Sequence, residues 1–142
     1  MHLPDINVWL ALAFPAHVHH LPAQAWFGAV PADRPCHFCR LSQLGCLRLA
    51  NNPKVFPAAA VAQDQAWKLY DLLLANPRVG FAVEPAGLET IWRSFTQSSQ
   101  FAPNAWADAY LAAFAKAARM RLVSFDAGFT RFQRLEFLQL KG

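Results

Sequence analysis

The chain has 142 residues, 55% of them hydrophobic, and 13 lysines and arginines against 9 aspartates and glutamates give it a formal charge of +4. This length suits one folding unit, so we predict a single domain over residues 1–142. No stretch reaches the roughly 20 consecutive apolar residues of a spanning helix, and no basic leader precedes an apolar run, so we expect a cytoplasmic rather than a membrane protein.

Hydrophobic periodicity predicts strands and helices that alternate along the chain. A strand of about four residues opens the sequence, and further strands are expected at 36–41, 78–83, 122–125 and 137–140. Helices are expected at 7–14, 17–27, 43–50, 61–75, 87–97 and 104–120, with a polar loop at 97–100. Ser42 and Asn104 are the expected N-caps of their helices. This alternation predicts an α/β domain with a largely parallel sheet and helices on both faces.

Three aspartates occupy positions where functional groups gather in such a fold. Asp5 and Asp126 each follow a predicted strand, and the carboxyl ends of parallel strands meet at one edge of the sheet. Asp108 lies in the first turn of a predicted helix, beside small residues that let this helix approach the sheet. We therefore expect the three carboxylates to converge. Converging carboxylates repel one another unless a cation neutralises them, and oxygen ligands suit Mg²⁺ or Mn²⁺.

A local structural role is the alternative for each acid. Asp5 would then only end a strand, Asp108 would be a first-turn carboxylate favoured by the helix dipole, and Asp126 would begin a turn. For any one of these residues, spacing alone favours the local role.

Basic residues concentrate towards the C-terminal end of the chain, which favours a polyanionic partner. The candidates for contacts with the phosphates of a nucleic acid are Arg119, Arg121, Arg131 and Arg134. A solvated basic surface explains these four arginines equally well, so both interpretations stay open.

Cysteines and histidines offer two further metal hypotheses. The Cys36–Cys39 spacing matches half of a zinc site, but no second pair stands at a matching distance, and Cys46 leaves the count odd. Buried cysteines that act as small hydrophobic residues are the favoured interpretation. His17, His19 and His20 can be imagined as a transition-metal site, but exposed helix residues are the favoured interpretation because no acid or thiol lies nearby in sequence.

Four short blocks together resemble the PIN-domain ribonucleases of the VapC toxin type. They are Leu-Pro-Asp-Ile-Asn-Val at 3–8, Arg-Leu-Ser-Gln-Leu-Gly-Cys-Leu-Arg at 40–48, Asp-Ala-Tyr-Leu-Ala-Ala at 108–113 and Ser-Phe-Asp-Ala-Gly-Phe at 124–129. The resemblance covers nearly the whole chain in the family's order and spacing. It implies a PIN-like three-layer α/β/α domain with a short, mainly parallel sheet. It also implies Mg²⁺- or Mn²⁺-dependent cleavage of RNA, a cognate VapB-like antitoxin and a homodimer.

By position, the resemblance assigns the catalytic and metal-binding acids to Asp5, Asp108 and Asp126, with Asn7 and Ser124 as supporting polar residues. One departure is Gln43, which stands where many PIN domains have a glutamate. Its amide oxygen can still bind a metal or a water molecule, but it brings no negative charge. The resemblance favours an endoribonuclease toxin of a type II toxin–antitoxin system. The alternative is an inactive PIN-like module that binds RNA or the antitoxin without cleavage.

Overall fold

Five short parallel strands form one central sheet in the computed structural model, which describes residues 1–99 and 101–142. In chain order the elements are β1 (His2–Pro4), α1 (Ile6–Ala13), α2 (His20–Gly28), β2 (Cys36–Phe38), α3 (Arg40–Ala50), α4 (Gln63–Leu74), β3 (Val79–Phe81), α5 (Leu88–Phe95), α6 (Ala105–Ala117), β4 (Arg121–Ser124), the 3₁₀ helix η1 (Ala127–Arg131) and β5 (Phe137–Gln139). The strand order is β3-β2-β1-β4-β5, and all neighbouring strands are parallel.

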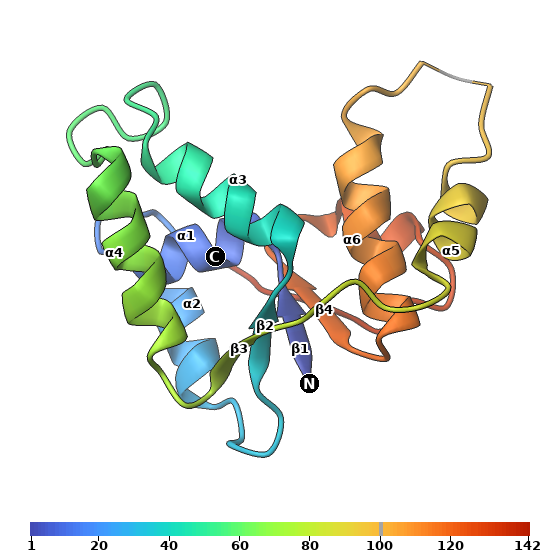
Figure 1. The fold of residues 1–142 in the computed structure, drawn as a ribbon, viewed down its shortest axis with the longest axis horizontal. Coiled ribbons are helices and arrows are strands. Elements are labelled where there is room, and N and C mark those ends of the chain that lie inside the picture. The colour runs from blue at the N-terminus through green and yellow to red at the C-terminus, as the bar shows by residue number, and fades with distance from the viewer. Residues whose placement is uncertain (100) are drawn as a thin grey trace.

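Helices cover both faces of this sheet, which confirms the expected three-layer α/β/α arrangement. Figure 1 shows α1 to α4 on one side and α5 with α6 on the other. On the first side, Trp9 and Phe38 are fully buried in one core cluster. On the second side, Phe114 and Leu122 belong to another cluster, together with a run of alanines in α6. These small side chains bring α6 close to the sheet, as the sequence predicts.

The predicted strands and helices are all present, with ends shifted by up to three residues. One expected cap is wrong, because α3 begins at Arg40 and Cys39 is its N-cap. Ser42 lies one turn inside and completes a capping box, since its Oγ accepts a hydrogen bond from Cys39 N at 3.0 Å. Asn104 takes the expected cap position of α6 but makes no capping hydrogen bond through its side chain. Gln100, in the predicted polar loop, lies outside the described residues.

The prediction of buried cysteines is confirmed, because Cys36, Cys39 and Cys46 are all buried free thiols. Burial raises the pKa of Cys36 and of Cys46 to about 12, so these thiols stay protonated. Among the described residues, no helix has the length and apolarity needed to cross a membrane.

Candidate active site

Asp5 lies where β1 ends and α1 begins, at the carboxyl edge of the sheet. Its backbone N donates to Val123 O at 2.8 Å, which continues the β1–β4 pairing by one residue. The chain then turns into α1, and Asp5 is the N-cap because its Oδ1 accepts a hydrogen bond from Ile6 N at 2.7 Å. This local structure fixes the carboxylate beside the end of β4.

Two polar side chains hold the second oxygen of this carboxylate. Asn7 Nδ2 donates to Asp5 Oδ2 at 2.9 Å, and Ser124 Oγ donates to the same oxygen at 2.7 Å. Ser124 Oγ also accepts from Asn7 Nδ2 at 2.9 Å and from Asp126 N at 3.0 Å. The predicted supporting residues Asn7 and Ser124 therefore orient Asp5 and link it to the backbone of Asp126.

The other two aspartates have partners of their own. Asp126 is exposed and caps η1, because its Oδ1 accepts from Gly128 N at 2.7 Å. Asp108 is half-buried in the first turn of α6, and its Oδ2 accepts from Arg131 Nη2 at 3.0 Å. Arg131 also donates to Gly128 O at 3.2 Å, so it connects the start of α6 to η1. An arginine thus supplies the positive charge beside Asp108.

The charges of Asp108 and Asp126 act on the Asp5 carboxylate. Burial raises the pKa of Asp5 to about 6; hydrogen bonds from Ser124 and Ile6 oppose this rise, and the charges of Asp108 and Asp126 add to it. Nevertheless, no group of three or more His, Cys, Asp or Glu residues in the described part of the chain could hold a metal ion as the side chains stand. The three-aspartate ion site therefore stays a prediction.

The chemistry of these side chains fits a hard divalent cation. Carboxylate, amide and hydroxyl oxygens are the donors present at this edge, and such oxygens suit Mg²⁺ or Mn²⁺. A cation that used all three carboxylates would compete with Arg131 for Asp108.

Gln43 does not join the hydrogen bonds around Asp5. It is buried near the start of α3, where its Oε1 accepts a short hydrogen bond from Arg40 Nη1 and its side chain bonds to Tyr70. The Arg40 guanidinium itself lies 4.8 Å from the centre of the Phe81 ring. A neutral residue at position 43 therefore sits beside a positive charge.

The four candidate RNA-binding arginines do not form one surface. Arg121 begins β4 and pairs with Glu136 at 2.8 Å, and the exposed Arg119 precedes it, so both lie at the amino end of the sheet. Arg131 and Arg134 instead line a cavity of about 540 Å³ next to η1, together with Lys116. In the described part of the chain, Arg131 is the one of these four arginines that pairs with a site aspartate, Asp108.

The histidines differ from their favoured interpretation, because His17, His19 and His20 are partly buried rather than exposed. His19 stacks on Phe125 with ring centres 4.3 Å apart, and His20 Nδ1 bonds to Ala11 O at 2.7 Å. A turn in the segment between α1 and α2 packs these rings onto the protein. Periodicity could not show this, since only His20 falls within a helix.

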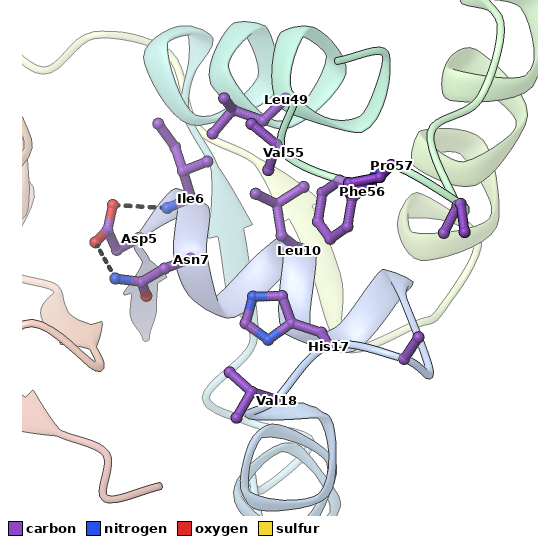
Figure 2. Close-up of a pocket in the computed structure, with 13 residues that line it drawn as sticks. Asp5, Ile6, Asn7, Leu10, His17, Val18, Leu49, Val55, Phe56 and Pro57 are labelled. Atoms are coloured by element: carbon purple, nitrogen blue, oxygen red, sulfur yellow. Dashed lines mark hydrogen bonds between the residues drawn. The ribbon is translucent and has the colours of Figure 1, made fainter. Parts of the chain in front are cut away.

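A cavity of about 620 Å³ adjoins the Asp5 carboxylate and was not anticipated from the sequence. Asp5 and Asn7 lie at one side of it, and His17 and Phe56 lie at the other (Figure 2). Phe56 belongs to the loop between α3 and α4, far from Asp5 in sequence. No motif marks this loop, so sequence reasoning had no signal for the cavity.

Comparisons with known proteins agree with this architecture. The model of the PIN domain family matches residues 3–135. Over 140 residues, covering 96% of both chains, the sequence is 41% identical to Ribonuclease VapC41 of Mycobacterium tuberculosis. It is also 33% identical to Ribonuclease VapC38 of the same organism, over 90% of this chain and 86% of the relative.

Solved structures share the fold at low sequence identity. VapC20 of M. tuberculosis, described as a sarcin-ricin loop cleaving toxin, superposes with a TM-score of 0.69 at 16% identity over 96% of this chain and 98% of that chain. VapBC2 from Rickettsia felis, bound to a DNA fragment from its promoter, gives a TM-score of 0.69 at 13% identity and covers 99% and 98% of the two chains.

Proposed function

The chain belongs to the PIN-domain family and, within it, to the VapC ribonucleases; on this premise we propose that it is a Mg²⁺- or Mn²⁺-dependent endoribonuclease, the toxin of a type II toxin–antitoxin system. The observation that carries the proposal is the position of Asp5. It is a partly buried carboxylate held by Asn7 and Ser124 at the edge of the sheet, with Asp108 and Asp126 close enough to raise its pKa.

Asp5, Asp108 and Asp126 would hold the metal ion. The chemistry supplied by such an ion is stabilisation of the charge that develops on the phosphodiester and a bound water of lowered pKa. Asn7 and Ser124 keep the Asp5 carboxylate in one orientation, so that it needs no reordering when RNA binds. Arg131 lies beside Asp108 and is placed to contact a phosphate if the ion displaces it from this carboxylate.

The direct test incubates the purified, antitoxin-free protein with total RNA, with and without Mn²⁺. We expect discrete RNA fragments with 5′-phosphate and 3′-hydroxyl ends only in the presence of the metal ion. Unchanged RNA under both conditions would contradict the proposal and favour the alternative of a module that binds RNA or antitoxin without cutting. Cleavage that persists in excess chelator would contradict the metal-dependent mechanism.

The remaining parts of the proposal concern partners. We propose a VapB-like antitoxin as a partner. The chain is similar to VapC ribonucleases, and one of the solved structures that shares its fold is a VapBC complex. A small reading frame beside the gene that encodes a DNA-binding protein would support this assignment. We also propose a homodimer, whose presence size-exclusion chromatography with light scattering would test.

Gln43→Glu is expected to tighten Mg²⁺ or Mn²⁺ binding by a few fold, because it adds a negative charge at the carboxyl edge of the sheet. The gain stays small because Arg40, which now bonds to Gln43, would pair with the new carboxylate. Titration calorimetry measures the affinity. Gln65→Glu, which adds the same charge on the exposed side of α4, is the control and should change nothing. Unchanged or weaker binding in the position-43 variant would place residue 43 away from the ion.

A further inference from the structure

The cavity beside Asp5 has the size of a small-ligand site. Its volume is about 620 Å³, within the roughly 300–1,000 Å³ of typical ligand pockets. Most of the residues around it are apolar, and Asp5 is the single charged group among them if His17 is neutral. Figure 2 shows the side chains of Leu10, Val55 and Phe56 around the same space, with Asp5 and Asn7 at one side. The cavity is therefore an open, mostly apolar groove that includes the carboxylate proposed to hold the ion.

His17 offers one hydrogen-bond donor to this cavity. Its Nδ1 accepts a hydrogen bond from His19 N at 3.1 Å, so the proton of the neutral ring belongs on Nε2. Burial lowers the pKa of His17, and the neighbouring His19 and His20 lower it further, which keeps the ring neutral at neutral pH. In the described part of the chain, no hydrogen bond uses His17 Nε2. This N–H is available to a ligand in the cavity.

Phe56 adds an aromatic surface. One face of its ring stacks on Phe14, with centres 4.3 Å apart and planes 16° from parallel. The His17 ring is tilted by 50° with its centre 6.2 Å away, so it does not cover the other face of Phe56. Among the described residues, no further ring stacks on Phe56. An unstacked aromatic face next to one N–H donor suits a flat heterocycle with acceptor atoms on its edge.

We propose that this cavity binds the nucleobase next to the scissile phosphate, with Phe56 as the stacking surface and His17 Nε2 as a donor to an acceptor on the base edge. The inference rests on the proposed ribonuclease function, because Asp5 then marks the phosphate and the adjoining cavity receives the attached base. An apolar peptide side chain would fill the space but offers neither an acceptor to His17 Nε2 nor a flat face to the Phe56 ring, whereas a base offers both, which favours a base as occupant.

Nucleotide binding can be measured without catalysis. Metal-free protein is titrated with AMP, GMP, CMP and UMP in turn, and with ribose 5-phosphate as a probe that lacks a base, while NMR follows the ring resonances of His17 and Phe56. We expect at least one nucleotide to cause saturable shifts in both rings and ribose 5-phosphate to cause none. Equal shifts from all five probes, or none from any, would overturn the subsite.

Cleavage specificity supplies the second measurement. A pool of random-sequence RNA is cut in Mn²⁺, and the ends are sequenced for His17→Leu, Phe56→Leu and the control Trp67→Leu, which removes a half-exposed aromatic ring on α4. The first two variants should lose the base preference at one position beside the cut, with KM raised by about tenfold and kcat changed far less. The control variant should keep the wild-type base preference and KM. His17→Gln, whose amide can donate in place of Nε2, should restore part of the preference.

The outcomes separate this subsite from the proposed function. If the wild-type protein does not cut RNA, the ribonuclease proposal fails, and the nucleotide titration alone decides the subsite. If the wild-type protein cuts and the position-17 and position-56 variants keep its preference and KM, the subsite is wrong and the ribonuclease stands. If those variants keep the base preference and KM but no longer bind the co-expressed antitoxin, the cavity is a protein-docking site. The subsite is then likewise overturned.

Discussion

Asp5→Asn is expected to lower metal-dependent RNA cleavage by at least about a hundredfold, because metal-ion catalysis supplies several kcal/mol and each ~1.4 kcal/mol is a factor of ten. The substitution removes the charge but nearly preserves the shape, and its amide oxygen can still accept from Ile6 N. Activity is measured on RNA in Mn²⁺. Asp71→Asn, on the exposed side of α4, is the control for loss of an acid and should cleave normally.

The same variant is expected to lack a pH dependence of stability that the buried Asp5 carboxylate gives the metal-free wild type. The Asp5 pKa is about 6 in the folded protein against an ordinary value of 3.8 for an aspartate, so folding disfavours the ionised form. Wild-type stability should therefore fall by at most about 3 kcal/mol as the pH rises from about 4 to 6, and it should then level off. The asparagine variant lacks this fall.

Urea denaturation at several pH values tests the stability difference. The gap between Asp5→Asn and the wild type should open between about pH 4 and 6 and stay constant above it. Added Mg²⁺ should raise the midpoint of the wild type more than that of the variant. A variant that cleaves RNA at the wild-type rate would remove Asp5 from the active site. A wild-type stability that does not fall relative to the variant between about pH 4 and 6 would show that folding does not disfavour the ionised carboxylate.

The position of Asp5 could be predicted because two local signals coincide there. A short apolar strand leads into a helical pattern, and an aspartate between them is a natural N-cap. The parallel sheet then places Asp5 beside the residues that follow β4, which is why Ser124 and Asp126 could be grouped with it. The layers of the fold follow from the same alternation of apolar strands and amphipathic helices.

Contacts between side chains far apart in sequence could not be predicted in this way. The pairing of Arg131 with Asp108 depends on how η1 directs one arginine towards the start of α6. Gln43 carries no sequence signal that its side chain bonds to Tyr70 of α4. The cavity depends on the loop that brings Phe56 onto Phe14. Each of these is a packing outcome that periodicity and propensity do not encode.

Trp9→Ala is expected to destabilise the protein by about 3–5 kcal/mol, the usual cost of deleting a buried large aromatic side chain. Trp9 is fully buried in α1 and stacks on Phe38 of β2, with ring centres 3.8 Å apart and planes 13° from parallel. Since domains of this kind are stable by roughly 5–15 kcal/mol, the loss is a large share of the total. Urea denaturation measures it. Trp67→Ala, at a half-exposed position, should cost less than about 1 kcal/mol.

A milder substitution separates packing from hydrogen bonding at the same site. The buried Trp9 Nε1 has no hydrogen-bond partner among the residues that the structure describes, which is an unfavourable state for a polar group. Trp9→Phe removes this unpaired donor and keeps an aromatic ring against Phe38, so it should cost less than half of what Trp9→Ala costs. If both substitutions cost the same, the indole N–H contributes to stability and the stacked ring is not the main term. Because α1 also carries Asn7 and follows Asp5, RNA cleavage should fall in Trp9→Ala only as far as the folded fraction falls.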